Sequence, residues 1–430
     1  MVRTGNQNNL YRLNKAICIL FCIWFAWPFA SYRLGMYFGV VLSLLWIATT
    51  GVFLFMMKWN ADLLLTICFF ITLLPYVLTG TFKYSTFNPL SLFGTFYLFF
   101  IGMFIFQYYH SRNDLHFLGL LAIITLFFYG IGSIQTIIGL FKYPAASRYL
   151  AVGNPDPVLR TTYTNAGIGG FNYVYSAIFL LIIMANDIVK KRSLYPFKYK
   201  MLVLLALTAM LFMIVRASYA IALMMSFLGC ALVLFVRRKR TFYILAILAI
   251  QFVCIMLIFS ATEGFFSTIF FKLADVFDSN PVIYEKLRDL ALTFGNLTIY
   301  SQTTNRIQLY YSSFRSFLSN PLFGVHGPFG TSSYIVGGHS GWLDLMAYYG
   351  LFATIPLFLA IGSNFIKIIR INRHNESTIG ILVVQLLFIA LGIINPILYV
   401  YHIGLVVFLI VPSVPYICWC LGCYGTGHFR

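Results

Sequence analysis

The sequence predicts an all-α, polytopic membrane protein with about twelve transmembrane helices. Of the 430 residues, 60% are hydrophobic and only 9% are charged, and the mean hydropathy is +0.86. A soluble domain carries about 25% charged residues, so this composition is typical of a chain whose solvent is lipid. A spanning helix needs about 20 apolar residues, and the chain has room for roughly a dozen such helices.

Apolar runs of suitable length predict the individual spans. They cover residues 16–32, 36–56, 61–80, 89–108, 117–140, 170–188, 201–216, 218–236, 241–260, 343–366, 377–395 and 397–420. No small-residue cleavage site follows the first run, so we expect it to be a retained span and not a cleaved signal peptide. Because no internal repeat or linker is visible, we expect one membrane domain over residues 1–430.

Clusters of Lys and Arg between the spans predict the orientation. The strongest clusters are 190–200, 237–240 and 367–373. Cytoplasmic loops carry an excess of these residues, and all three clusters face the cytoplasm if the spans alternate. This topology places both termini in the cytoplasm. The net charge of +18 therefore indicates contact with membrane lipids and not with nucleic acid, because the basic residues lie between apolar runs.

Two segments that face away from the cytoplasm in this topology are long. They are residues 141–170 and residues 261–342. The second is too long for a simple turn, and loops of such length are usually functional or disordered. It contains apolar residues at helical spacing, so we expect a large extracytoplasmic loop with short amphipathic helices on the outer leaflet.

Arg216 is the first candidate functional residue. It lies between two apolar runs, where a charge at the centre of a span would cost about 2.5–3.5 kcal/mol. Residues 201–236 are too many for one span, so we expect Arg216 at the outer turn of a helical hairpin. Either it extends to lipid headgroups, or it binds an anion there. His402, in the last span, is expected to make one interhelical hydrogen bond.

A second candidate is Arg306, at the start of a predicted helix. Apolar residues recur at helical spacing up to Phe317, Thr304 or Asn305 supplies an N-cap, and the dipeptide at 320–321 ends the element. Arg306 then lies in the first helical turn, where the helix dipole disfavours a cation unless an anion is bound nearby. An anionic ligand and a plain surface arginine are the two interpretations.

Two glycine-rich segments contain histidines. His326 lies in the segment 321–330, and His339 lies in the segment 337–341, directly before the next span. A partly dehydrated histidine at a helix start is suited to accept a proton at neutral pH. The alternative for each is an ordinary interfacial histidine.

Together these segments resemble the O-antigen polymerase and O-antigen ligase superfamily of bacterial membrane glycosyltransferases. The family typically has a Thr-x-Ser-Arg-Gly-like turn, an Arg-containing outer helix, Asn-Pro-Leu-x-Gly-x-Gly, and His-Asn before Leu-x-x-Leu-x-x-x-Gly-Leu-x-Gly. The matching segments here are 215–217, the helix with Arg306, 320–326 and 339–353, in that order over about a third of the chain. The departures are Ala217, His326 and Ala353 in place of glycines, Ser340 in place of asparagine, and Tyr348-Tyr349 where an acidic residue is often found.

The resemblance implies a reaction and a set of roles. The donor is a glycan on undecaprenyl diphosphate, and the acceptor is a hydroxyl of a second lipid-linked repeat unit. Arg216 and Arg306 would stabilise the diphosphate leaving group, since guanidinium groups bind phosphate oxygens bidentately. His339 would orient the acceptor hydroxyl or take its proton. Further substrate-binding candidates are Arg148, Arg160, Arg315 and His326.

No cofactor or metal is expected, because no convincing carboxylate pair occurs in the outer segments. The expected location is the bacterial cytoplasmic (inner) membrane, with a flippase and a chain-length regulator as further partners. We favour a polymerase of O-antigen, capsule or exopolysaccharide. A ligase that transfers glycan to lipid A core shares all of these motifs. A transporter or flippase is the alternative from another class, and it predicts internal repeats and buried midplane charges that the sequence does not show.

Overall fold

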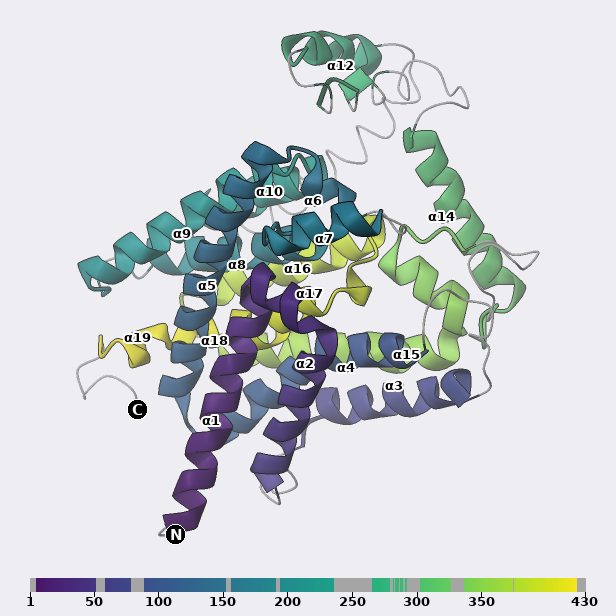
Figure 1. Ribbon diagram of the computed structural model, residues 1–430. Helices are drawn as coiled ribbons and strands as arrows, with labels where there is room; N and C mark the ends of the chain where they lie inside the picture. Colours follow the sequence, from purple (N-terminus) through teal and green to yellow (C-terminus); the bar gives the residue numbers. More distant parts are fainter. Residues whose placement is uncertain are drawn as a thin grey trace.

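The computed structural model describes residues 5–51, 59–78, 89–151, 156–190, 194–235, 265–278, 302–325, 336–373 and 375–423, with residues 281, 283–285, 287–288 and 291. Within these ranges every regular element is a helix and there is no strand (Figure 1). Six of the described helical segments are long and apolar enough to cross a membrane. They are α2 (Pro28–Thr50), α5 (Leu115–Lys142), α8 (Phe171–Lys190), α9 (Phe197–Arg216), α15 (Gly341–Ile371) and the segment Tyr401–Cys420.

Other helices complete the bundle. They are α1 (Gly5–Ala26), α3 (Ala61–Leu78), α4 (Pro89–Ser111), α10 (Ala220–Phe235) and α16 (Thr378–Ile394). The C-terminal segment is divided into η2 (Ile397–Tyr399), α17 (Tyr401–Leu405), η3 (Val406–Ile410), α18 (Val411–Ser413), η4 (Val414–Tyr416) and α19 (Ile417–Cys420). A helix thus occupies eleven of the predicted runs, while the run 241–260 lies outside the described residues. The chain is a helical, membrane-embedded protein, and the count of twelve spans stays a prediction.

The first two spans differ from their predicted limits. We expected one span over 16–32, but α1 ends at Ala26 and α2 begins at Pro28, which occupies a position in the first helical turn. The predicted break near residue 35 is instead a kink inside α2, where Gly35 has a φ of 70°. Glycine has no Cβ and reaches this conformation without strain. A proline therefore sets the helix boundary, although the apolar pattern runs straight through it.

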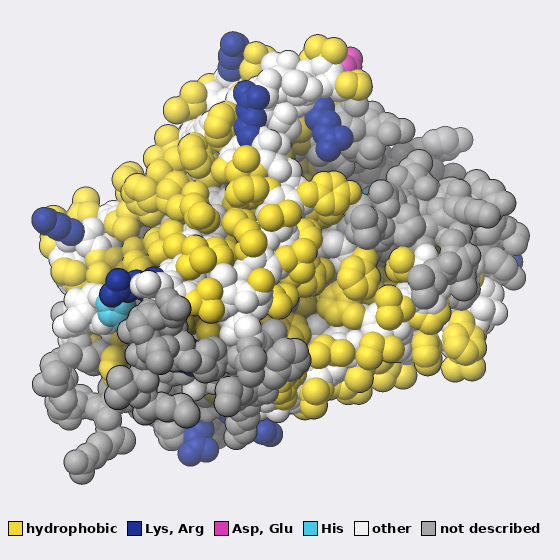
Figure 2. All heavy atoms as spheres, turned by 60° about the horizontal axis from the view of Figure 1, so that its bottom comes forward, with side chains coloured by type: hydrophobic (Ala, Val, Ile, Leu, Met, Phe, Trp, Pro, Cys, Tyr) yellow, Lys and Arg dark blue, Asp and Glu magenta, His cyan; other side chains and the backbone are white. Residues whose placement is uncertain are grey.

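The bundle has an apolar exterior and an interior rich in aromatic residues. Side chains such as Ile138, Leu204 and Met224 are 66%, 59% and 70% exposed. The face drawn in Figure 2 is largely hydrophobic, with Lys and Arg side chains near its edges. Inside, Phe388 and Phe408 have ring centroids 6.1 Å apart in an edge-on arrangement. Exposed apolar side chains of this extent are typical of a surface that faces lipid.

Buried charges are paired at the helix ends that we predict to be cytoplasmic. Lys367 of α15 donates a short hydrogen bond to Asp62 of α3, and the Asn364 side chain donates to the same carboxylate at 2.8 Å. Asp62 is fully buried. Lys15 of α1 lies 2.5 Å from the Asp114 carboxylate, which caps α5. These pairs neutralise charge that would otherwise be costly in a poorly solvated position.

Among the described residues of the predicted outer segments, four helices have defined bounds. They are α6 (Ala146–Tyr149), α7 (Pro157–Asn165), α12 (Phe265–Val276) and α14 (Gln302–Ser319). The predicted end of α14 is correct, but the helix begins at Gln302 and not after Thr304 or Asn305. Arg306 therefore lies beyond the first turn, and the argument from the helix dipole does not hold for it. Much of the segment 261–342 lies outside the described residues.

The turn after α14 is joined to a kink in α15 by backbone hydrogen bonds. Gly350 has a φ of 62°, and this interrupts α15. Leu351 and Phe352 donate their backbone N–H groups to the carbonyls of Pro321 and Leu322 at 2.8 and 2.9 Å. A Cβ at position 350 would lie 2.3 Å from the Leu322 oxygen. The glycine therefore permits the close approach that holds α14 to α15.

Candidate functional site

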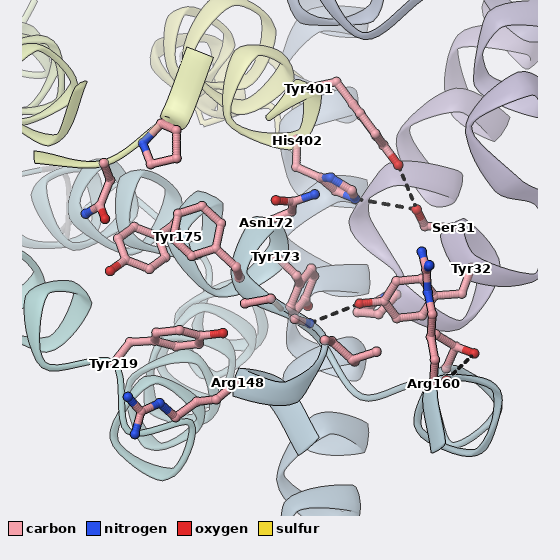
Figure 3. A pocket seen from close by; sticks show the side chains of 18 of the residues that line it. Ser31, Tyr32, Arg148, Arg160, Asn172, Tyr173, Tyr175, Tyr219, Tyr401 and His402 are labelled. Atoms are coloured by element: carbon pink, nitrogen blue, oxygen red, sulfur yellow. Dashed lines mark hydrogen bonds between the residues drawn. The ribbon is translucent and has the colours of Figure 1, made fainter. Parts of the chain in front are cut away.

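A pocket of about 560 Å³ opens among helix ends that all lie on the predicted outer side. Its walls are the start of α2, helices α6 and α7, the start of α8, the turn before α10, the loop before α15 and the segment between α16 and α17 (Figure 3). The polar and charged side chains that line it are Ser31, Tyr32, Arg148, Arg160, Thr164, Asn172, Tyr173, Tyr175, Tyr219, His339, Asn395, Tyr401 and His402.

Helices α6 and α7 bring Arg148 and Arg160 to this pocket. The Asp156 carboxylate accepts from the Val158 N–H at 2.8 Å and so caps α7, whose first residue is a proline. The Asp156 N–H donates to the hydroxyl of Tyr149 at 2.7 Å and ties α7 to α6. These local contacts give the two arginine-bearing helices a defined position, although they contain only 4 and 9 residues.

A second set of hydrogen bonds attaches α6 to the spanning helices. The Tyr219 hydroxyl donates to the Ser147 carbonyl at 2.8 Å, and the Ser147 hydroxyl donates to the Gly169 carbonyl at 2.7 Å. Tyr219 follows Ser218, whose φ of 57° forms the tight turn between α9 and α10. The turn therefore fixes the Arg148 helix against the bundle.

The charged groups of the pocket are all basic. Arg148, Arg160 and two histidines line it, and no Asp or Glu is among its described lining residues. Neither arginine forms a salt bridge within the described ranges. In Figure 3, Arg148 lies beside Tyr219 while Arg160 extends along Tyr32. Unpaired guanidinium groups on a concave surface attract anions and bind phosphate or carboxylate oxygens. The electrostatics of the pocket therefore favour an anionic ligand.

Aromatic rings form one wall of the pocket. Tyr175 and Tyr219 have ring centroids 5.6 Å apart at an interplanar angle of 72°, and Phe171 lies 4.2 Å from Tyr175. Aromatic faces offer large apolar contact area, and the tyrosine hydroxyls add polar ends. Such a wall suits a ligand that has both apolar and hydroxyl-bearing surfaces.

A buried polar cluster lies on another side of the pocket. The Ser31 hydroxyl is 3.2 Å from the Tyr401 hydroxyl and 3.5 Å from Nε2 of His402. The rings of Tyr401 and His402 are stacked with centroids 4.2 Å apart. His402 thus makes the expected single interhelical contact, to α2. Sequence reasoning had not placed His402 in a pocket, because one polar residue in an apolar run gives no sign of which neighbours it meets.

His339 lines the pocket from the loop before α15, as its position in the sequence indicated. The Ser340 side chain accepts from the Leu343 N–H at 3.3 Å and caps the helix, and the Ser340 N–H donates to Asp344 at 2.9 Å. Asp344 also accepts from the Ser313 hydroxyl of α14 at 2.6 Å. The His339 loop is therefore held to α15 and α14 by one buried carboxylate.

The structure places the other predicted residues elsewhere. Arg216 lies at the expected turn, but its guanidinium group donates to the Leu140 carbonyl at 3.5 Å and lies over the Phe141 ring, outside the lining of this pocket. Arg315 is exposed on α14 and also lies outside the lining. His326 and the side chain of Arg306 lie outside the described residues. The pocket thus brings together Arg148, Arg160 and His339.

Tyr310 shows where α14 passes the pocket. Its hydroxyl donates to the Ile394 carbonyl at 3.1 Å, directly before the lining residue Asn395.

No cluster of three or more metal-ligating side chains occurs in the described part of the chain.

The fold and the pocket define a helical membrane protein with a basic, aromatic-walled pocket at one end of its bundle. No protein-family model matches the chain, and no curated protein matches it.

Proposed function

We propose that this chain is a membrane glycosyltransferase that uses a glycan on a polyprenyl diphosphate as its donor, and that it acts as a polysaccharide polymerase. The observation that carries the proposal is the pocket itself, in which two arginines, two histidines and aromatic rings meet without a carboxylate. Its ligand chemistry fits a diphosphate joined to a sugar. The resemblance of the motifs to the O-antigen polymerase and ligase superfamily supplies the reaction class.

In this proposal Arg148 and Arg160 bind the diphosphate. Cleavage of the bond between the anomeric carbon and the phosphate oxygen leaves an additional negative charge on that oxygen. Guanidinium groups stay protonated at every physiological pH and offer paired N–H donors to phosphate oxygens. Preorganised donors directed at developing charge usually give the largest single contribution to such catalysis. The two arginines take, in this proposal, the role that the resemblance implied for Arg216 and Arg306.

His339 acts on the acceptor. A hydroxyl of the second lipid-linked unit forms the new bond to the anomeric carbon, and its proton leaves to the imidazole or to the departing diphosphate. A histidine is suited to this transfer because its ordinary pKa is near neutral pH. The contacts of Ser340 and Asp344 fix the loop that carries it. Arg306 stays a candidate for the diphosphate because the resemblance implies that role for it.

The expected location is the bacterial cytoplasmic membrane with both termini in the cytoplasm. What supports it is that every lining segment comes from a helix end on the predicted outer side, where repeat units are joined after a flippase delivers them. In Figure 1, α6 and α7 lie at the opposite end of the bundle from the N terminus. A flippase and a chain-length regulator are the protein partners that this location implies.

Reconstitution tests the proposal directly. Purified protein in liposomes is given lipid-linked repeat units extracted from source cells that lack the chain. A ladder of longer glycans on lipid supports a polymerase. Transfer of glycan only to added lipid A core would show a ligase and contradict the polymerase. Movement of the units across the bilayer without a new glycosidic bond would show a transporter and contradict the proposal of an enzyme.

Variants connect the activity to the pocket. We expect Arg148→Gln and Arg160→Gln each to lower the rate at least about a hundredfold, as the loss of one oxyanion-stabilising donor does elsewhere. We expect a loss of the same order for His339→Ala, because the variant cannot take the acceptor proton. Arg370→Gln is the matched control, because Arg370 is exposed at the far end of α15. Ladder formation at the wild-type rate by all three pocket variants contradicts the site assignment.

A further inference from the structure

We propose that the uncharged polar side chains of the pocket form a subsite for the hydroxyl groups of a neutral sugar ring. It consists of the cluster of Ser31, Tyr401 and His402 together with Asn395, which lines the same pocket, and we call it the hydroxyl subsite. The inference deepens the proposed function and rests on it for the identity of the substrate as a lipid-linked glycan.

The first support is an unpaired nitrogen on His402. The side chain is 6% exposed, and Nδ1 has no hydrogen-bond partner among the described residues. Its other nitrogen has only the long contact to Ser31. Buried polar atoms in native structures nearly always have a partner, so an orphan that lines a cavity points to a partner that binds there.

Asn395 supplies the second, independent support. It is 5% exposed, lines the same pocket, and its side-chain nitrogen also has no partner within the described part of the chain. Its backbone is held firmly, because its carbonyl accepts from Gly341 at 3.1 Å and from Ile397 at 2.8 Å. The amide group is therefore presented from a rigid position. An amide nitrogen only donates, so it requires an acceptor.

The chemistry of these atoms selects a hydroxyl-bearing ligand. A neutral imidazole either accepts or donates at Nδ1, while the amide nitrogen of Asn395 only donates. A sugar hydroxyl both donates and accepts, so the hydroxyl groups of a glycan suit both atoms. A phosphate oxygen only accepts. In Figure 3, His402 and Tyr401 lie apart from Arg148, which lies beside Tyr219. Arg160 extends toward Ser31 and Tyr32 in the same view, so the uncharged side chains adjoin one arginine of the pocket and lie apart from the other.

Binding measurements with two kinds of probe test the hydroxyl subsite. The full-length protein is kept in a zwitterionic detergent without sugar. The sugar probes are the octyl glycosides of glucose, galactose and N-acetylglucosamine, with octyl tri(ethylene glycol) as the comparator of equal chain length. The anionic probe is undecaprenyl diphosphate without a glycan. We expect at least one octyl glycoside to bind more tightly than the comparator.

The variants must distinguish the binding of sugar from the binding of diphosphate. We expect His402→Phe and Asn395→Leu each to weaken glycoside binding about tenfold, the loss of one net hydrogen bond, and to leave diphosphate-lipid binding within about twofold. Arg148→Gln is expected to weaken binding of the diphosphate lipid and to leave glycoside binding within about twofold. His110→Phe is the matched control, since His110 is a partly buried histidine at the end of α4 that does not line the pocket.

Two results overturn the inference: glycosides that bind no better than the comparator, or subsite variants that bind them as the wild type does. If His402→Phe fails to fold by thermal denaturation, Asn395→Leu and His402→Gln decide the question. If the subsite variants lose glycoside binding but the wild-type protein makes no polymer, the subsite is supported and the polymerase is refuted. If the wild-type protein makes polymer but the variants bind glycosides normally, the polymerase is supported and the subsite is refuted.

Discussion

Asp344 joins the His339 loop to α14, and its removal tests how much the pocket depends on this junction. The side chain is 1% exposed and accepts from the Ser313 hydroxyl at 2.6 Å and from the Ser340 N–H at 2.9 Å. Asp344→Ala removes both acceptors. Each buried donor left without a partner costs about 1–3 kcal/mol, which gives about 2–6 kcal/mol for the pair.

The geometry narrows this range. The Ser313 hydroxyl has a second acceptor, the Leu309 carbonyl at 3.2 Å, and it can turn fully to that atom. The Ser340 N–H has no comparable alternative among the described contacts. We therefore expect Asp344→Ala to lower the free energy of unfolding by about 2–4 kcal/mol, and Asp344→Asn, which keeps one acceptor oxygen, by about 1–2 kcal/mol.

Two assays measure the consequences. Unfolding by SDS titration in mixed micelles gives the change in free energy, and hydrogen exchange reports the backbone of residues 337–345. Because the same carboxylate holds the His339 loop, we expect faster exchange there and a lower rate of glycan transfer in the variant that still folds. A double-mutant cycle with Ser313→Ala isolates the interaction energy between Ser313 of α14 and Asp344 of α15. We expect this energy to be about 0.5–3 kcal/mol, the range for residues in contact. An unfolding free energy for Asp344→Ala within about 0.5 kcal/mol of wild type, the range of ordinary surface changes, refutes the reasoning.

Three further predictions concern positions away from the pocket or at its edge. Burial raises the pKa of Asp114, but hydrogen bonds from Lys15 and Tyr11 outweigh it and hold this pKa below its ordinary value of 3.8. The stabilisation of the folded protein by Asp114 is therefore present above pH 3.8 and is lost as the pH falls through the lower pKa of the folded state. Asp114→Asn should abolish this acid-dependent loss of stability in SDS titrations. A pH profile of stability that is unchanged in the variant contradicts this prediction. Gly350→Ala should destabilise the protein strongly because of its positive φ and the nearby carbonyl, whereas Gly362→Ala, with open space around it, should gain up to about 1 kcal/mol of helix propensity. Equal effects of the two in the same titration are inconsistent with this account. Tyr219→Phe removes the bond that holds α6, so we expect weaker binding of undecaprenyl diphosphate by about tenfold with little change in thermal stability; unchanged binding argues against α6 as a support for Arg148.

The sequence predicted the helical framework well because hydropathy is a local property. Most described helices begin and end within a few residues of the predicted spans, and a turn follows Arg216 where the apolar runs indicated one. The boundary between α1 and α2 was wrong because the apolar pattern continues through Trp27 and Pro28. The start of α14 was wrong because the polar residues before Thr304 also belong to the helix.

The pocket was predictable only in part, because it is assembled from segments far apart in the chain. Arg148 and Arg160 were found because they lie in an outer segment, and His339 because of its glycine-rich surroundings. Asn395 and His402 were not predicted as pocket residues. In the sequence Asn395 lies at the end of a predicted span, and His402 is a single histidine inside another. Arg216 had the expected position, but the packing of α9 against the end of α5 directs it to Phe141. Packing between distant helices decides such contacts, and no local pattern encodes it.

The buried pair of Asp62 and Lys367 has a consequence for biosynthesis. The two residues are 305 positions apart, so α3 leaves the ribosome long before the partner of its carboxylate exists. At about 5–20 residues per second, the interval is roughly 15–60 s. During that time Asp62 must be protonated, directed to the headgroups or shielded by the insertion machinery. We infer that α3 takes its final position only after α15 has been made, so this part of the bundle is completed late in translation.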